Sequence, residues 1–146
     1  MQDLAAKKFI PFRSRNEAYN RRVMVWVCKS CKTWCERTKP QICTSCGGDD
    51  FLFFASRAEA KRYAELLLLE KHGQIKNLKT QVRYPLKVDG VLICNYIADF
   101  IYEKNGDYVV EDVKPQHDAG QAAIFKLKQK LMLAIHGVNI TIIKRS

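Results

Sequence analysis

The sequence has no apolar stretch long enough to cross a bilayer. Its longest purely aliphatic run is Leu66 to Leu69, whereas a membrane-spanning helix needs about 20 consecutive apolar residues. No apolar stretch follows the basic residues near the N-terminus, so no secretory signal is expected. Internal repeats and low-complexity tracts are also lacking. These absences argue against a membrane protein or a secreted protein, and we expect a cytoplasmic location.

Acidic residues are scarce beside basic ones. Lys and Arg number 25 against 15 Asp and Glu, which gives a formal net charge of +10. That balance attracts polyanions, of which nucleic acid is the commonest, although anionic membranes and simple solubility also explain basic surfaces. Hydrophobic residues make up 47% of the 146 residues. This is enough to bury the core of one domain, or of one domain plus a small module.

Five of the six cysteines fall in one short segment, where four of them form two Cys-x-x-Cys pairs. Cys28 and Cys31 form the first pair, and Cys43 and Cys46 form the second, which runs directly into Gly47-Gly48. Two such pairs complete a tetrahedral thiolate shell, which is typical of a structural Zn²⁺ site. A disulfide framework or a redox pair is the alternative. It is disfavoured because disulfides are rare in the cytosol.

The remaining cysteines and the two tryptophans are less informative. Cys35 could replace one of the four ligands or remain a free buried thiol. Cys94 lies in a predicted strand, where a small core residue is the simpler interpretation. Trp26 and Trp34 could stack on bases, but in so small a module they are more often its core. With β-prone runs before the first pair and after the second, the segment is predicted to be a zinc ribbon.

Downstream of the cysteines, the pattern predicts a mixed α/β domain of order α-β-β-β-α-β. Ser56 to Glu59 is a capping box, and a helix should follow to about His72. Asn105-Gly106 is the strongest short indicator of a hairpin, and Pro85 and Pro115 are each expected to end a strand. The other elements are expected to be strands over about 78–86, 91–103 and 108–114, a helix over about 121–136, and a last strand over 138–143.

The predicted hairpin places two carboxylates opposite each other. With Asn105-Gly106 as a two-residue loop, Lys104 faces Asp107 and Asp99 faces Asp112. Directly opposed side chains have Cβ atoms roughly 4.5–5.5 Å apart. Two partly buried carboxylates at that separation repel each other unless a cation compensates. Mg²⁺ is a hard ion that takes carboxylate oxygens as ligands, so the pair predicts a magnesium site.

Lys114 lies two residues after Asp112 and therefore on the same face. An ammonium group there can orient a water molecule or stabilise charge that grows on a phosphate. The alternatives are a plain buried Asp–Lys ion pair, a bulge that carries Asp112 to the surface, or a one-residue slip that brings Glu111 inward. Both faces of the hairpin should be apolar, which predicts a central, mostly covered position. We expect Ile97, Ile101 and Val110 on the acidic face, and Tyr96, Ala98, Phe100, Val109 and Val113 on the other.

The pattern of Asp99 and then Asp112-Val113-Lys114, preceded by a helix-borne glutamate, resembles the PD-(D/E)xK nuclease superfamily, whose core has the same order of elements. The stretch from Phe53 to Ile143 is similar, more closely, to a family of small phage-encoded endonucleases. Ala98 stands where the superfamily label has Pro, a position that is often substituted. The matching pieces are residues 54–60, Gln81, and residues 96–100, 110–114 and 125–128.

The resemblance implies a role for each of these residues. Asp99 and Asp112 would bind the catalytic Mg²⁺ or Mn²⁺ with help from the Val113 carbonyl, and Lys114 would be the catalytic lysine. Glu59 would complete the site from the helix, although its capping role competes with this one. Glu65 is the alternative helix acid. Gln81 could touch the site or be an ordinary polar residue of its strand. His117 and Asp118 could assist near the site, although a solvated loop is the simpler interpretation.

The implied protein is a Mg²⁺-dependent DNA endonuclease that acts as a homodimer in the host cytoplasm. Its expected substrate is branched DNA such as a Holliday junction. We expect a basic arm over 1–22, the ribbon over 23–54 and the nuclease domain over 55–146, so that zinc removal unfolds only about the first third. The alternative functions are a nucleic-acid-binding adaptor or transcription regulator on a non-catalytic scaffold, and strand cleavage with recombination partners. Phosphate contacts would come from the ribbon and from Lys126, Lys128 and Lys130, which could equally be a solvated helix face.

Overall fold

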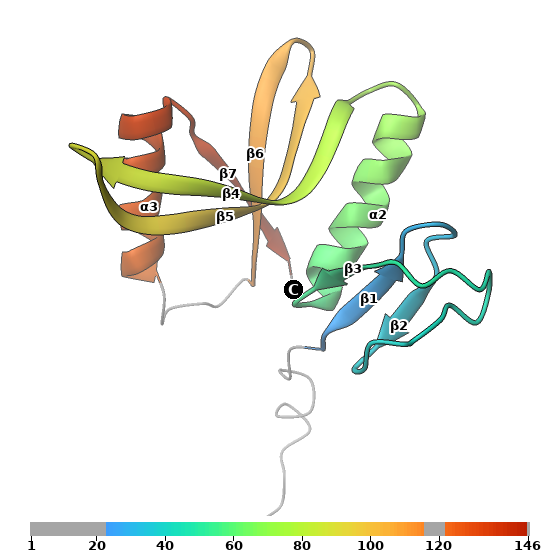
Figure 1. Ribbon diagram of the computed structural model, residues 1–146. Coiled ribbons are helices and arrows are strands. Elements are labelled where there is room, and N and C mark those ends of the chain that lie inside the picture. The colour runs from blue at the N-terminus through green and yellow to red at the C-terminus, as the bar shows by residue number, and fades with distance from the viewer. Residues whose placement is uncertain (1–22, 116–121, 146) are drawn as a thin grey trace, which may run out of the picture.

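The computed structural model describes residues 23–115 and 122–145, and these form a mixed α+β structure with two helices and two sheets. The small sheet has the order β2-β1-β3 and the larger one the order β4-β5-β6-β7, in which only β6 and β7 are parallel (Figure 1). In chain order the elements are β1 (Val25–Cys28), β2 (Trp34–Glu36), β3 (Phe51–Phe54), α2 (Arg57–Lys71), β4 (Lys76–Val88), β5 (Val91–Lys104), β6 (Asp107–Pro115), α3 (Ala122–His136) and β7 (Ile140–Arg145).

Two sequence expectations fall on residues that are not described. The basic arm over 1–22 lies outside the described residues, as do His117 and Asp118. Neither helix within the described ranges has the length and apolar character needed to span a bilayer.

Helix α2 begins at the predicted capping box. Ser56 is the N-cap, and its Oγ accepts a hydrogen bond from the Glu59 backbone N–H at 3.2 Å. The Glu59 carboxylate accepts in return from the Ala55 N–H at 3.1 Å. Gly73 follows the helix with a φ of 73°, the left-handed conformation common just past a helix C-terminus. Local sequence is therefore sufficient to define both ends of α2.

Strand β4 continues past Pro85, so the prediction that this proline ends the strand was wrong. Pro85 pairs with Asn95 of β5, and the ladder runs on to the pair Val88↔Val91. The reason is that β4 is an edge strand, where a residue without an N–H group can be accommodated. Pro115, in contrast, is the last residue of β6.

The β5–β6 hairpin has the predicted register, from Lys104↔Asp107 through Phe100↔Glu111. Phe100 packs with Tyr63 of α2 in one buried cluster, whereas its neighbour Ile101 packs with Met132 of α3 in another. Successive residues of a strand point to opposite faces. Helices α2 and α3 therefore cover opposite faces of the larger sheet (Figure 1).

The alternation of faces along β5 breaks at Asp99, which corrects part of the predicted pattern. Tyr96 and Ala98 belong to the α3-side cluster together with Ile101, not to the face of Phe100, and Ile97 is 48% exposed. Across the ladder from Asp99, between the pairs Thr80↔Phe100 and Val82↔Ala98, Gln81 has a φ of 52°. Backbone in that conformation cannot continue a regular pleat, so side chains change face there.

The ribbon shares its core with the larger sheet. Val25 and Val27 of β1 and Phe54 of β3 are almost fully buried in the same cluster as Tyr63 and Leu66 of α2. A second, small cluster of Trp26, Phe51 and two cysteines lies on the other side of the ribbon. Loss of the ribbon would therefore also expose part of the main core.

Candidate metal site and acidic cluster

The four cysteines of the two Cys-x-x-Cys pairs meet in space. The sulfurs of Cys28, Cys31, Cys43 and Cys46 all lie within 4.8 Å of one another, and all four thiols are free. The Cys28–Cys46 sulfurs are 3.6 Å apart and the Cys31–Cys43 sulfurs 3.5 Å. Tetrahedral zinc with bonds of about 2.3 Å would separate its sulfur ligands by roughly 3.8 Å. The cluster can therefore hold a metal ion such as zinc.

Backbone turns aim the two pairs at each other. The Lys32 N–H donates to Cys28 O at 2.9 Å, and the Gly47 N–H donates to Cys43 O at 2.8 Å. A Cβ atom on Gly48 would lie 3.3 Å from Ser30 Oγ and in van der Waals contact with the sulfurs of Cys46 and Cys28, so this turn lies directly against the cluster. The hydroxyl of Thr33, 3.1 Å from the Cys31 sulfur, lowers the pKa of that thiol to about 6. The Thr33 contact favours the thiolate form of Cys31, whereas the neighbouring sulfurs raise the pKa of Cys46 to about 12.

Cys35 and the tryptophans lie outside the four-sulfur group. Cys35 pairs with Trp26 across β1 and β2 and does not join the group. The Trp26 ring lies 4.8 Å from that of Phe53, and Trp34 packs against the main core cluster. Cys94 packs against the α3-side cluster. The positions of Trp26, Trp34 and Cys94 agree with the expectation that they are core residues, and Cys35 is a half-buried free thiol.

A second polar cluster lies where β5 and β6 separate. Asp99 Oδ2 accepts the Val113 N–H at 2.7 Å. Asp112 is 3% exposed; its Oδ2 accepts the Tyr96 hydroxyl at 3.2 Å, and its Oδ1 lies 3.0 Å from Lys114 Nζ. The two aspartates and the lysine thus lie near one another, although the β5–β6 ladder ends at Phe100↔Glu111 and does not include the predicted pair of Asp99 with Asp112.

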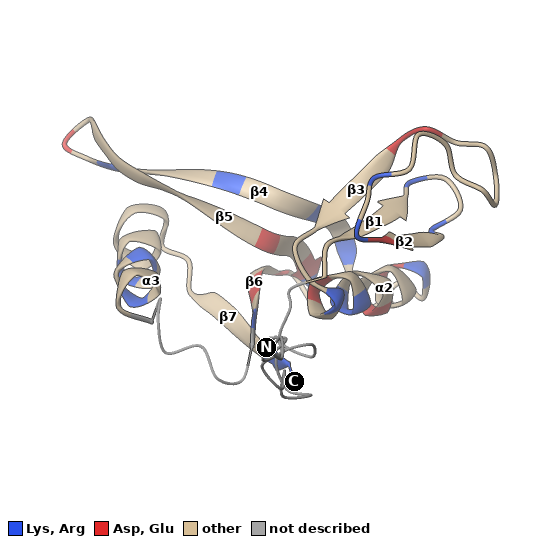
Figure 2. Cartoon of the chain, turned by 90° about the horizontal axis from the view of Figure 1, so that it is seen from below, with Lys and Arg blue, Asp and Glu red and all other residues tan. Residues whose placement is uncertain are grey.

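The electrostatics of this cluster extend to Glu59. Burial raises the pKa of Asp99 to about 8, and the negative charges of Asp112 and Glu59 add to the effect. Burial likewise raises the pKa of Glu59, with a further contribution from Asp112 that Lys114 opposes. Figure 2, seen from below, shows acidic positions of β5, β6 and α2 near the junction of these elements. In the absence of a cation, the site favours retention of a proton at neutral pH.

Glu59 does not complete a compact ligand set. Among the described residues, it forms no group with the two aspartates as tight as the cysteine cluster. Its carboxylate oxygens instead accept the Ala55 N–H and the Ser56 hydroxyl, each at 3.1 Å. The cap and the acidic cluster therefore compete for this side chain, as its two predicted roles implied.

Three other candidates have partners elsewhere. Gln81 is exposed, and its side-chain amide donates to the backbone carbonyl of Phe53 in the ribbon. Glu65 pairs with Arg62 and Arg145, so it is not the helix acid of this cluster. Glu111 is 1% exposed and binds Arg62 on the α2 side of the sheet.

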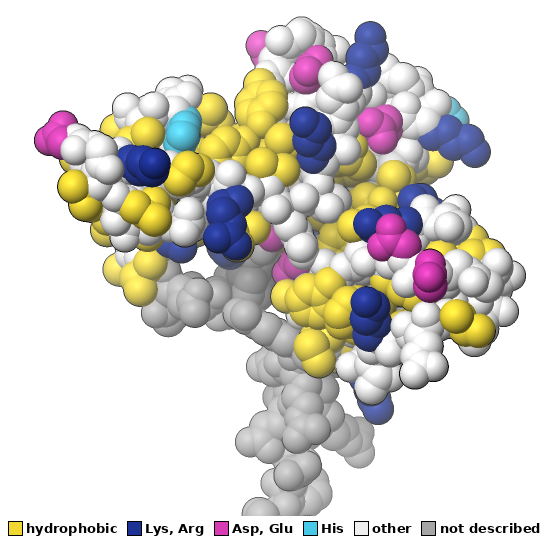
Figure 3. Space-filling model, viewed as in Figure 1, with side chains coloured by type: hydrophobic (Ala, Val, Ile, Leu, Met, Phe, Trp, Pro, Cys, Tyr) yellow, Lys and Arg dark blue, Asp and Glu magenta, His cyan; other side chains and the backbone are white. Residues whose placement is uncertain are grey.

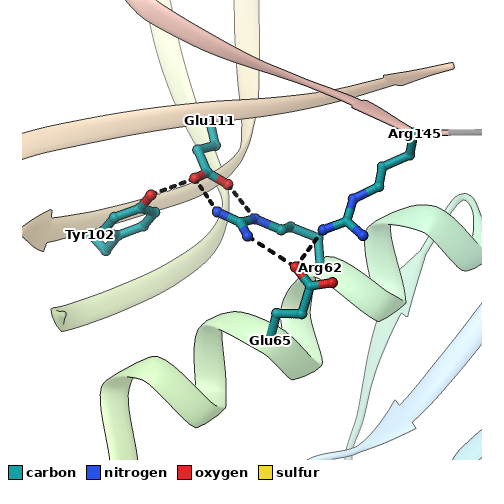
Figure 4. A network of polar contacts seen from close by, with 5 residues as sticks. All are labelled: Arg62, Glu65, Tyr102, Glu111 and Arg145. Carbon is teal, nitrogen blue, oxygen red and sulfur yellow. Dashed lines mark hydrogen bonds and ion pairs between the residues drawn. The ribbon is translucent and has the colours of Figure 1, made fainter. Parts of the chain in front are cut away.

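Arg62 lies between the two glutamates (Figure 4). Its Nε and Nη2 bond both oxygens of Glu111 at 2.9 and 2.6 Å, and its Nη1 lies 3.0 Å from Glu65. The Tyr102 hydroxyl also donates to Glu111, and Arg145 of β7 binds Glu65. The network fixes α2 to three strands of the sheet, and so fixes the position from which Glu59 reaches the acidic cluster.

Glu111→Ala is expected to lower the free energy of unfolding by about 3–5 kcal/mol, because it leaves the largely buried Arg62 without its main partner. Glu65→Ala is the matched control. Its carboxylate is 43% exposed, so we expect a loss of about 1 kcal/mol or less. Urea unfolding measures both variants. Equal losses in the two would contradict a structural role for the buried pair.

Sequence reasoning missed Tyr96. It was assigned to the opposite face of the sheet, yet its buried hydroxyl donates to Asp112. Burial and the neighbouring carboxylates hold the pKa of Tyr96 well above its usual range, so the hydroxyl remains a donor. No local pattern reveals this contact, because it depends on the change of face at Asp99.

The lysines of α3 differ in their surroundings. Lys126 and Lys130 are exposed, and Lys128 is half-buried. The ammonium of Lys114 lies 4.5 Å from the ring centroid of Phe125, so the first turn of α3 adjoins the acidic cluster. The α3 lysines remain candidates for phosphate contacts.

Fold and sites together define a mixed α+β protein with a cysteine cluster able to hold a metal ion and a separate buried acidic cluster. A model of a protein family of unknown function, DUF1064, matches residues 49–146. The match spans more than half of the chain, so the chain belongs to this family. It begins after Cys46 and thus excludes the four cysteines. No curated protein and no solved structure matches the chain.

Proposed function

We propose that this protein is a Mg²⁺-dependent endonuclease that hydrolyses phosphodiester bonds in DNA. The observation that supports this best is the pair of Asp112, which is buried, and Asp99, which is half-buried, with Lys114 beside Asp112. Two neighbouring carboxylates that are largely removed from water are costly together, and a hard divalent cation compensates for both charges. The resemblance to PD-(D/E)xK nucleases rests on the same three residues.

The donor set fits Mg²⁺, which prefers oxygen ligands and keeps several waters. Asp99, Asp112 and the Val113 carbonyl would hold the ion, and Glu59 could join if it left the cap. When bound, Mg²⁺ supplies Lewis-acid polarisation of a phosphate oxygen. Tyr96 binds one oxygen of Asp112, which would leave the other oxygen available to hold the ion. Lys114, displaced from that second oxygen, would neutralise charge on the phosphate.

We propose that the cysteine cluster binds structural Zn²⁺. A closed four-thiolate shell leaves no open position for a substrate, unlike catalytic zinc sites. The cluster holds the loops of the ribbon, whose strands contribute Val25, Val27 and Phe54 to the main core. Its role would be to fold and position the ribbon, while a different metal acts in the acidic cluster.

Plasmid nicking tests the nuclease activity. The zinc-loaded protein should nick supercoiled plasmid when Mg²⁺ is added and not in its absence. Lys114→Ala should slow nicking by at least about a hundredfold, because it removes a charge that acts in the transition state. Lys104→Ala, at the exposed end of the same hairpin, is the matched control. Nicking by Lys114→Ala at the wild-type rate would refute the assignment.

A panel of DNA structures tests the substrate class. We propose branched DNA, cut by a homodimer with paired sites. The panel contains duplex, single strand, flap, fork and four-way junction. Symmetric cutting of the junction alone supports a junction resolvase, and equal activity on every substrate rejects it.

A nucleic-acid-binding adaptor is the second candidate. It is favoured by the contacts of Asp112, since Tyr96 and Lys114 between them contact both of its oxygens. Such a cluster could be a buried ion pair with no catalytic role. DNA binding without Mg²⁺-dependent nicking would support this candidate over the nuclease.

A further inference from the structure

The larger sheet extends into a two-stranded arm, here defined as residues 82–98 of β4 and β5. Strand β6 pairs with β5 only from Phe100 onward, so no third strand among residues 23–115 and 122–145 pairs with the arm. In Figure 1 the arm runs away from the β5–β6 hairpin and ends beyond α3. Leu86 and Tyr96 of the arm pack with Met132, so α3 covers one of its faces.

The other face of the arm is exposed and basic. Arg83 and Lys87 are exposed, and neither has an ion pair or hydrogen bond with any residue that the structure describes. Their cross-strand partners are Ile97 and Leu92, which are 48% and 50% exposed. Figure 3 shows basic side chains among hydrophobic ones over this part of the molecule. The face therefore offers positive charges that alternate with aliphatic surface.

The tip of the arm is aliphatic. Val88, Val91, Leu92 and Ile93 are 44%, 62%, 50% and 55% exposed. Asp89 is the one acidic residue in the arm. Single exposed apolar residues are ordinary, but a contiguous group on a projecting hairpin is typical of a binding surface.

The arm leads directly to the acidic cluster, because Asp99 follows its last residue. At about 3.3 Å per residue, Leu92 lies roughly 23 Å along β5 from Asp99. A turn of B-form DNA is roughly 34–36 Å long. A DNA molecule with a phosphate at the acidic cluster could thus reach the tip within one helical turn.

We propose that the arm binds branched DNA, with Arg83 and Lys87 on backbone phosphates and the aliphatic tip against bases at the branch. Aliphatic side chains contact bases where stacking is interrupted, whereas basic side chains bind phosphates of any sequence. A second copy of this chain fits the face less well, since its net charge is +10. The proposal rests on the proposed nuclease function and deepens it by assigning the choice of substrate to the arm.

Two variants separate the two parts of the arm. Anisotropy measures binding of the zinc-loaded protein to a four-way junction and to a matched duplex, without Mg²⁺. Val91→Ser with Leu92→Ser should reduce the preference for the junction at least about fivefold and leave duplex affinity unchanged. Arg83→Glu with Lys87→Glu should weaken both at least about tenfold and reduce the salt slope, dlogK/dlog[salt], by about 2.

Matched controls exclude general effects of charge and hydrophobicity. Leu68→Ser removes an exposed aliphatic residue of α2, and Lys61→Glu with Lys104→Glu makes the same charge change away from the arm. Controls as damaging as the arm variants would overturn the proposal. Arm variants that bind both DNAs like wild type, or that change only the molar mass of the protein in solution, would also overturn it. The binding assay is independent of cleavage: if junction preference depends on the arm but plasmid is never nicked, the nuclease function fails and the DNA-binding role of the arm stands.

Discussion

Cys43→Ser is expected to destabilise the whole described fold rather than the ribbon alone. Cys43 is 2% exposed and supplies one of the four clustered sulfurs. Structural zinc in small modules is bound with roughly 10–16 kcal/mol of apparent free energy, much of which becomes folding free energy. Loss of one thiolate should remove most of this contribution to the free energy of folding. Because Val25, Val27 and Phe54 belong to the main core, the effect should spread beyond the ribbon.

Thermal unfolding and zinc analysis measure this effect. We expect the Tm of Cys43→Ser to fall by about 10 °C or more, since a few kcal/mol corresponds to that shift in a chain of this size. Cys35→Ser is the matched control, because Cys35 lies in the same ribbon but outside the four-sulfur group. It should retain one zinc per chain and nearly the wild-type Tm. Full zinc content in Cys43→Ser would contradict the assigned site.

Hydrogen exchange distinguishes the two possible extents of unfolding. The sequence alone predicted that zinc removal unfolds about the first third of the chain. The shared core predicts instead that protection also falls in α2 and in β5 around Phe100, which packs against the same cluster. Unchanged protection in α2 after zinc removal would restore the original expectation.

Asp99→Asn is expected to abolish cleavage and, at the same time, to stabilise the Mg²⁺-free protein. Nicking should fall by at least about a thousandfold, because loss of a ligand carboxylate removes electrostatic stabilisation of the transition state. The asparagine side-chain oxygen can still accept the Val113 N–H. The variant also removes the electrostatic cost of a carboxylate whose pKa is raised to about 8 by burial and by Asp112.

The stability effect has a definite pH dependence. The pKa of Asp99 is about 8 in the folded protein, against about 3.9 in an unfolded chain. The folded state therefore holds the proton more tightly, and this contribution to stability is complete below about pH 4 and is lost as the pH rises through 8. Asp99→Asn avoids that loss. Its advantage should be near zero at pH 4, grow between pH 4 and 8, and reach roughly 5 kcal/mol above pH 8, because the two pKa values differ by about 4 and each unit corresponds to about 1.4 kcal/mol.

Urea unfolding between pH 4 and 9 measures this difference. Asp107→Asn, at the exposed end of the same hairpin, is the matched control and should show no such trend. Added Mg²⁺ should stabilise the wild type and not Asp99→Asn, because a ligand stabilises only the state that binds it. A stability difference independent of pH would contradict the raised pKa, and wild-type nicking by Asp99→Asn would contradict its role as a ligand.

Local patterns were enough to predict several parts of this protein. The spacing of four cysteines predicted the cluster, and Ser56 with Glu59 predicted the start of α2. The Asn105-Gly106 turn predicted the pairing from Lys104↔Asp107 to Phe100↔Glu111. These features depend on residues within a few positions of one another, where turn chemistry and capping act directly.

Other features were decided only by tertiary structure, because they depend on contacts between distant segments. Pro85 is accommodated because β4 happens to be an edge strand. Glu111 is buried because Arg62, far away in the chain, meets it with two hydrogen bonds. Tyr96 reaches Asp112 because side chains change face at Asp99, across from the left-handed Gln81.

The cysteine site illustrates the same division. Sequence alone determined which four thiols meet, since two short turns bring each pair together. Only the tertiary structure decided that the strands beside them complete the core under α2. The physical reason is that burial of Val25, Val27 and Phe54 requires an apolar surface supplied by distant residues, and no local pattern specifies that surface.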